Sequence, residues 1–382
     1  MRKVFFTLSL LILLGALHAV SNYSLISNGF EPSAVNLAMG GSPIGAVNFW
    51  HNDPLNSYSN PAIMSLHSGF SYSTSGYDYL HSVDSNLTDN LKYNAAFCGI
   101  TYRGIGFLAP YENQQDEFHS TRTDYGVFDI VDEEEFEGSS IHPEDIADIY
   151  GVSVNLQDFY RNFASEGRLL PENIDLAIGM NFVHNISTIS LDGSSSKTDS
   201  ANLGILTKAP ILNRNSIFIE TALGASFYNV FNKAKTNQTG SDETTIYKRA
   251  NLAWGLSGAW KNKRFNAGGI PGIIENLGTM RVLAGYCDEL ASEPVIIGFG
   301  TELGIADMLF LRTGYHNDEA GKIKGVTYGI GINLHYRNLV GLNYNYSYFP
   351  AGSIYKEKVI EGYGLNLDIF GLIELSKIIE DL

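Results

Sequence analysis

The sequence lacks the features that mark several common classes of protein. Beyond residue 20 it has no apolar run near the ~20 residues that a transmembrane helix needs, which excludes a helical inner-membrane protein. Its two cysteines, Cys98 and Cys287, lie far apart and do not make a disulfide framework. Basic residues are scarce, with 25 Lys and Arg against 41 Asp and Glu. The net charge of −16 therefore argues against a nucleic-acid partner.

Residues 1–19 are typical of a secretory signal peptide. Two basic residues, Arg2 and Lys3, precede an apolar stretch that is too short to span a bilayer. Small residues allow cleavage after Ala19 or Ser21. We therefore expect the chain to be exported.

The residues that are abundant favour β-structure. The chain has 22 Tyr, 21 Phe and 39 Gly beside 11 Pro, a composition rich in strand-forming aromatics. Apolar residues alternate with small or polar ones from Arg249 to Lys261, and the same period of two recurs from Val326 to Tyr336. These segments are longer than the ~5 to 6 residues usual for soluble strands, and aromatics crowd their ends. The pattern predicts an all-β fold, a transmembrane antiparallel β-barrel whose small-residue lumen is filled by another element.

Fourteen segments have this character. They are 68–80, 93–102, 104–111, 122–131, 174–190, 200–209, 216–231, 246–261, 279–287, 295–304, 309–316, 325–336, 339–348 and 361–370. The shortest connections follow even-numbered strands, as expected when both termini are periplasmic. We predict four regions: a signal peptide (1–19), an N-terminal plug or hatch (20–67), the barrel (68–370) and a periplasmic extension (371–382).

One connection, residues 132–173, is too long for a periplasmic turn and predicts either a small helical insert or a miscounted strand. Leu156, Phe159, Tyr160 and Phe163 recur at helical spacing after a potential cap at Asn155 and before a potential stop at Gly167. A shorter helix is expected from Pro143 to Tyr150.

Two patches resemble a known superfamily. Residues 34–64 read AVNLAMGGSPIGAVNFWHNDPLNSYSNPAIM, and residues 309–350 contain Arg312-Thr313-Gly314-Tyr315. Together they resemble the FadL-like long-chain fatty-acid transporters and, within that superfamily, the PorV/PorQ outer-membrane proteins of type IX secretion. The resemblance implies that the first patch folds into the barrel as a plug or hatch. Its matching residues are Met39, Gly40, Gly41, Asp53, Asn60, Pro61 and Ala62.

Several polar residues have lumenal parity along their strands, namely Glu220, Glu302, Arg312, His316 and His335. They could line a substrate path or form an acid–base pair, but charged residues inside a barrel normally pair with one another or with a plug. The sequence has no hydrolase, metalloprotease or nucleotide motif, and we expect no enzymatic activity and no cofactor.

Two other motifs favour a structural interpretation. The Met39-Gly40-Gly41-Ser42 stretch lacks the strand, helix and Lys of a phosphate loop. The acidic run at 132–137 lacks the spaced ligands of a calcium loop, so we expect no metal there.

The resemblance implies an outer-membrane barrel of the PorV/PorQ type, acting in type IX protein secretion or in surface attachment of exported proteins. The expected partners are outer-membrane lipid and secretion-system proteins or exported cargo. Loops 232–245, 288–294 and 349–360 are the expected contact surfaces. The alternatives are a FadL-like channel for uptake of hydrophobic small molecules and a purely structural or adhesive barrel.

Overall fold

The computed structural model describes the chain in segments. These are residues 31–80, 91–114, 117–119, 121–124, 128–130, 139–141, 144–163, 171, 174–187, 196–214, 216–231, 233–236, 248–261, 276–289, 295–319, 323–336, 340–350 and 358–367. The predicted signal peptide, most of the predicted contact loops, the acidic run, Gly167 and the C-terminal extension lie outside them.

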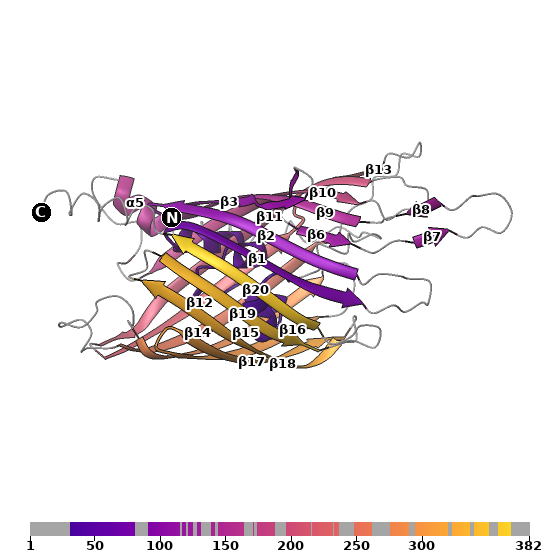
Figure 1. Cartoon of the computed structure of the whole chain (residues 1–382). Helices are drawn as coiled ribbons and strands as arrows, with labels where there is room; N and C mark the ends of the chain where they lie inside the picture. Colours follow the sequence, from indigo (N-terminus) through magenta and orange to yellow (C-terminus); the bar gives the residue numbers. More distant parts are fainter. Residues whose placement is uncertain are drawn as a thin grey trace, which may run out of the picture.

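The predicted fold class is confirmed: the strands form a closed antiparallel barrel (Figure 1). Its wall contains β1 (Gly69–Leu80), β2 (Leu91–Tyr102), β3 (Ile105–Pro110), β9 (Glu144–Asn155), β10 (Asp175–Ser187), β11 (Ser196–Asn213), β12 (Ile217–Tyr228), β14 (Arg249–Lys261), β15 (Asn276–Glu289), β16 (Ile296–Ile305), β17 (Leu309–Asp318), β18 (Ile323–Tyr336), β19 (Val340–Phe349) and β20 (Lys358–Leu367). Each strand pairs with its neighbours in this order, and β1 closes the ring by pairing with both β2 and β20. The described wall thus has the fourteen strand positions that the sequence predicts.

Smaller strands add to this wall. β6 (Thr121–Asp124) occupies the same position as β3, between β2 and β9. β13 (Lys233–Thr236) extends the pairing of β11. Two separate hairpins are formed by β4 (Glu112–Gln114) with β5 (Glu117–His119), and by β7 (Phe128–Ile130) with β8 (Ser139–Ile141).

The outer surface of the barrel is apolar. Large side chains such as Phe182, Leu252 and Trp260 are exposed on outward-facing positions, whereas their sequence neighbours point into the lumen. A contiguous exposed apolar band of this kind suits a lipid environment and not water. The chain is therefore an outer-membrane barrel. Among the described helices, none has the length and apolar character needed to cross a bilayer.

Two sequence predictions near the fourth strand are wrong. The predicted strand at 122–131 is divided between β6 and β7, and the fourth position in the wall is β9. The predicted helix from Pro143 to Tyr150 is part of β9, because Asp145, Ala147 and Ile149 face inward with period two. Short apolar runs fit either period, and pairing with β10 along the whole segment decides for the strand.

The second predicted helix is present as α5 (Leu156–Phe163), directly after β9. Asn155 caps it, because its Oδ1 accepts from the backbone N of Gln157 at 3.1 Å and of Asp158 at 3.4 Å. The helix lies at the end of the barrel where the short turns are, outside the ring of strands (Figure 1).

The lumen holds the N-terminal segment, which we call the plug and define as residues 31–67. It contains α2 (Ala34–Ala38), α3 (Ser42–Gly45), α4 (Asn56–Ser59) and the 3₁₀-helix η2 (Pro61–Leu66). Nearly all of its side chains are buried. Figure 1 shows the indigo plug enclosed by the strands, so the core of the molecule lies between the plug and the wall.

Candidate functional site

The candidate site is the contact between the plug and the lumenal wall. The plug turns sharply at Gly40 and Gly41, whose φ angles of 107° and 87° are open to glycine at little cost. Ser33 caps α2 by accepting from Asn36 N at 3.4 Å, and Pro61 begins η2, where no backbone N–H is needed. Because its short helices are joined by such turns, the plug folds into a compact unit that crosses the lumen.

The wall meets the plug with glycines. A Cβ at Gly298 would come within 2.7 Å of the Gly40 carbonyl, and one at Gly224 would overlap the Ala46 carbonyl. The same close approach occurs between the plug backbone and lumenal glycines on several other strands, namely Gly179, Gly204, Gly285, Gly300 and Gly314. The plug backbone is therefore seated directly against the sheet. Neither sliding nor rotation is possible without disrupting these contacts.

Asn60 joins η2, the loop after α3 and the wall. Its Oδ1 accepts from Ala62 N at 3.0 Å, and its Nδ2 donates to Ala46 O at 2.6 Å and to Ile205 O at 3.1 Å. Asn60 is fully buried, so water cannot satisfy these polar groups and they depend on the three hydrogen bonds. The Asn-Pro-Ala motif thus fixes the plug to β11.

The Met39-Gly40-Gly41 turn is held by the opposite part of the wall. His316 Nδ1 lies 2.8 Å from Gly40 O, and the Thr327 hydroxyl donates to Ala38 O at 2.9 Å. Gly41 fits beside the His316 ring and Phe349. Asp53, the remaining residue of the resemblance motif, lies in the turn before α4, where its Oδ1 accepts from Leu55 N at 3.0 Å.

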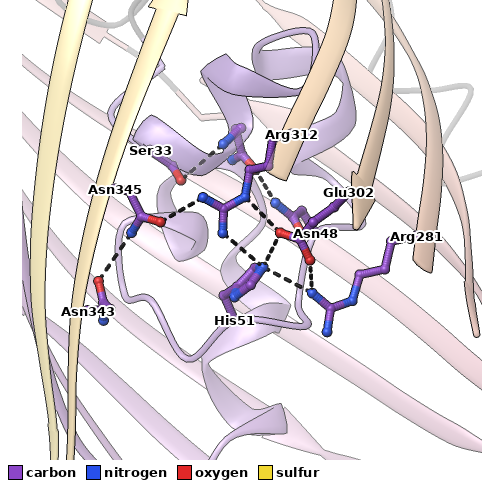
Figure 2. A network of polar contacts seen from close by, with 9 residues as sticks. Ser33, Asn48, His51, Arg281, Glu302, Arg312, Asn343 and Asn345 are labelled. Carbon is purple, nitrogen blue, oxygen red and sulfur yellow. Dashed lines mark hydrogen bonds and ion pairs between the residues drawn. The ribbon is translucent and has the colours of Figure 1, made fainter. Parts of the chain in front are cut away.

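A buried carboxylate links the plug to three wall strands (Figure 2). Glu302 Oε2 lies 2.6 Å from His51 Nε2 and 2.7 Å from Arg312 Nε, and Glu302 Oε1 accepts from Arg281. Arg312 also donates to Asn345 Oδ1 at 2.7 Å. Glu302 is 1% exposed and Arg312 is 4% exposed, so the network is shielded from bulk water. We call these five residues the Glu302 network.

His51 takes part in this network as a neutral group. Burial lowers the pKa of His51 from 6.5 to about 4, against the attraction of the Glu302 carboxylate. The adjacent Trp50 indole donates to Glu220 Oε1 at 2.6 Å. The bulky Phe49-Trp50-His51 run therefore supplies two contacts between the plug and the wall.

A cavity of about 420 Å³ lies between the plug and the barrel end with the short turns. Its lining is mainly polar and includes His51, Arg281, His335 and a set of asparagines, namely Asn52, Asn276, Asn333, Asn343, Asn345 and Asn366. Four residues of the Glu302 network line it, namely His51, Arg281, Arg312 and Asn345. The cavity is therefore poorly suited to bind a hydrophobic molecule.

The predicted lumenal residues are thus placed on the inner face but are not all together. Glu302 and Arg312 form one network, whereas Glu220 contacts Trp50, His316 contacts the Gly40 turn and His335 lines the cavity. Within the described residues no group of three or more His, Cys, Asp or Glu could hold a metal ion. Neither Cys98 nor Cys287 forms a disulfide.

Sequence reasoning missed the plug residues that complete these contacts. Trp50 and His51 lie between the matched residues Gly41 and Asp53 and belong to neither motif, and Arg281 has the same lumenal parity as Thr279 and Leu283 in β15. The alternation of β15 could have singled out Arg281 as a lumenal cation. Its pairing with Glu302 depends on the register of β15 and β16, which places the two residues opposite each other.

No family model and no curated protein matches the sequence. Among solved structures, the toluene transporter TbuX of Ralstonia pickettii is 9% identical, with 87% of this chain and 99% of that chain covered and a TM-score of 0.37. The CymD monoaromatic hydrocarbon channel is 7% identical (87% and 96% covered, TM-score 0.43). A FadL homologue of Pseudomonas aeruginosa is 10% identical (92% and 100% covered, TM-score 0.39). We take no substrate or mechanism from likenesses this distant.

Proposed function

We propose that this outer-membrane barrel passes small hydrophobic molecules from its lumen sideways into the membrane, through an interrupted strand in its wall. The observation that carries the proposal is the split of one strand position between β3 and β6. Between them lies the β4–β5 hairpin, which pairs only with itself among the described strands.

The strand registers locate the interruption. On the β2 side, Pro110 lies opposite Phe97 and Thr121 opposite Ala95. A single residue is needed between them, and Tyr111 fills that place by donating its backbone N–H to Ala96 O at 3.3 Å. The nine residues from 112 to 120 are therefore extra. The β9 side agrees, because Leu108 lies opposite Gly151 and Thr121 opposite Ala147.

The pairing of β3 with β9 is interrupted at this point. β3 keeps its pairing with β2 as far as Pro110, but its ladder with β9 ends at the Leu108–Gly151 pair. Pro110 has no backbone N–H to donate, which weakens the ladder at the end of β3. An insertion of this size bends a strand away from its neighbour, as a bulge does on a smaller scale.

The lumen beside the interruption is apolar. Phe97, Leu108 and Ile149 project inward there and pack with Leu55 and Tyr58 of the plug in one buried cluster. The polar Glu302 network lies on β15 to β19, away from these strands. A hydrophobic molecule that leaves at the interrupted strand would therefore pass apolar side chains and not the charged network.

The seated plug supports a lateral exit over an axial one. The glycine contacts and the Glu302 network hold the plug across the lumen, and the cavity beyond it is polar. A hydrophobic solute gains nothing by entering that cavity, but it gains the full transfer free energy by leaving through the wall into lipid.

Deleting residues 112–120 tests this proposal. The deletion joins Tyr111 to Thr121 with the register on both β2 and β9 unchanged, so the barrel can close without rearrangement. We expect uptake of radiolabelled toluene and oleate to fall to the level of cells without the barrel. A variant that replaces the same nine positions with Gly and Ser keeps the interruption and should retain uptake. Unchanged uptake by a folded, heat-modifiable deletion variant would refute the lateral exit.

A role in type IX secretion or surface attachment, as in the PorV/PorQ proteins, is the second candidate. It is favoured by the seated plug, since the Met39-Gly40-Gly41 and Asn60-Pro61-Ala62 motifs bind it to the wall and leave the barrel as a closed scaffold. Affinity purification from native membranes separates the candidates. Stoichiometric secretion components or cargo, with normal partner recovery in the 112–120 deletion, would favour this second function.

A further inference from the structure

We propose that α5 is a membrane-interface anchor whose Phe159–Phe163 face inserts among the phospholipids of the leaflet at the short-turn end of the barrel. The helix has no assigned role in the proposed channel, and the inference depends on the outer-membrane barrel and not on its substrate. In outer-membrane barrels the short turns face the periplasm.

α5 exposes part of its apolar side, whereas a helix on the surface of a soluble protein buries that side against the core. Leu156, Phe159, Tyr160 and Phe163 form one apolar side, and Phe159 and Phe163 are 40% and 54% exposed. On the other side Gln157 is only 5% exposed, and Asp158 packs against the rim. On the polar side Gln157 and Asp158 thus face the barrel while Arg161 and Asn162 are exposed, and on the apolar side Phe159 and Phe163 face away from the barrel. A helix normally buries its apolar side, so a nonaqueous medium is the expected surrounding of this one.

The helix is fixed in this orientation by its cap and by its contacts with the turn between β2 and β3. Asn155 caps it, and Asn155 N donates to Gly104 O at 2.7 Å in the turn between β2 and β3. A Cβ at Gly104 would lie 2.8 Å from Asp158 Cβ and 3.0 Å from Phe159 N, so the helix sits directly on that turn. The rings of Phe159 and Phe163 contact each other, with centroids 4.9 Å apart. Phe159 and Phe163 therefore form one continuous exposed surface at the short-turn end of the barrel.

Lipid is favoured as the occupant because this surface continues the lipid-facing band. Tyr102, beside the turn that carries α5, is 42% exposed on β2, and Phe107 of β3 is 53% exposed. Arg103 lies over the Tyr102 ring at 4.9 Å, and Arg161 is exposed on α5. Aromatic rings with neighbouring arginines are the usual residues at the level of phospholipid headgroups.

Site-directed fluorescence in pure lipid tests the proposal. Single cysteines at Phe163 and, as a control on the polar side, at Asn162 would be introduced into the full chain after Cys98→Ser and Cys287→Ala, and labelled with bimane. In phosphatidylethanolamine–phosphatidylglycerol vesicles we expect doxyl-lipid quenching at 163 to exceed that at 162 several-fold. Aqueous iodide should show the reverse order.

Equal iodide access at the two positions in folded, reconstituted protein would overturn the proposal, and so would protection at 163 that requires a second protein. The variant F159S/F163S supplies an independent readout. Its heat-induced mobility shift should match that of the unsubstituted chain in detergent micelles and fall below it in vesicles. An equal shift in both media would also contradict the anchor. Neither result depends on uptake, so failure of the channel proposal leaves this test unaffected.

Discussion

At the residue scale, the Glu302 carboxylate accepts from two buried guanidinium groups and lies within hydrogen-bond distance of one imidazole. Burying a charge is costly unless it is paired, and here one carboxylate compensates Arg281 and Arg312 together. The Glu302 side chain therefore holds together the plug and the strands β15, β16 and β17.

Glu302→Gln should destabilise the folded barrel strongly. It leaves two cations buried around a neutral amide, for which we expect a loss of about 3 to 5 kcal/mol in the free energy of unfolding. The loss is measured as the urea concentration at which half of the protein no longer migrates as the folded band when samples are run unheated on a gel. Glu220→Gln is the control, because its amide oxygen can still accept from Trp50. An effect no larger than that of the control would contradict the role of the network.

A second residue-scale prediction concerns the glycines of the lumen. Gly224→Ala places a methyl group on the Ala46 carbonyl, so we expect a destabilisation of about 1 to 3 kcal/mol from overpacking. Gly341→Ala is the matched control, since it also faces the lumen but its Cβ would meet nothing closer than 3.6 Å. Unfolding in urea compares the two variants, and similar midpoints would show that the plug is not seated as described.

At the scale of elements, η2 depends on both ends of one amide. Asn60→Asp keeps the Oδ1 cap on Ala62 N but loses the Nδ2 bonds to Ala46 and Ile205, whereas Asn60→Ala loses all three. We expect Ala to cost about 1 to 2 kcal/mol through the cap alone, and more through the unsatisfied carbonyls. Limited proteolysis of the plug would report the loss. Equal cleavage of both variants and the unsubstituted chain would exclude an anchoring role.

The elements also show what the sequence can predict and where it fails. Long strands with one apolar face, such as β14 and β18, are legible from their period of two. β9 is not, because its Ile146, Ile149 and Tyr150 also fit a helix and only pairing with β10 separates the two. The insertion after Tyr111 is equally hidden, since it is defined by the registers of both neighbouring strands and not by any local residue pattern.

At the scale of the whole molecule, the plug and the barrel form one unit. The high content of glycine and small polar residues on lumenal positions predicts a filled lumen, and the alternation along the strands is enough to show it. Which plug residue meets which strand is not predictable in this way, because contacts such as His51 with Glu302 are separated by 251 residues and depend on the closed ring.

This coupling predicts a pH dependence of stability. The folded-state pKa of His51 is lowered from 6.5 to about 4, so between these values the unfolded chain binds a proton that the folded protein excludes. Stability contributed by His51 is therefore complete above about pH 6.5 and declines as the pH falls toward 4. The temperature of the heat-induced mobility shift should drop more between pH 7 and pH 5 than it does in His51→Gln. A parallel drop in both proteins would contradict the shifted pKa.

The central claim is that the plug stays in place while hydrophobic molecules leave through the wall. It can be tested by linking the plug to the wall, since Ala34 Cβ lies 3.2 Å from the position of a Cβ at Gly362, so that a small backbone shift gives the Cβ–Cβ separation of a disulfide. Ala34→Cys with Gly362→Cys, in a chain without Cys98 and Cys287, would be assayed for toluene uptake before and after oxidation. The account predicts equal uptake in both states, whereas loss of uptake on oxidation and recovery on reduction would show that the plug must move.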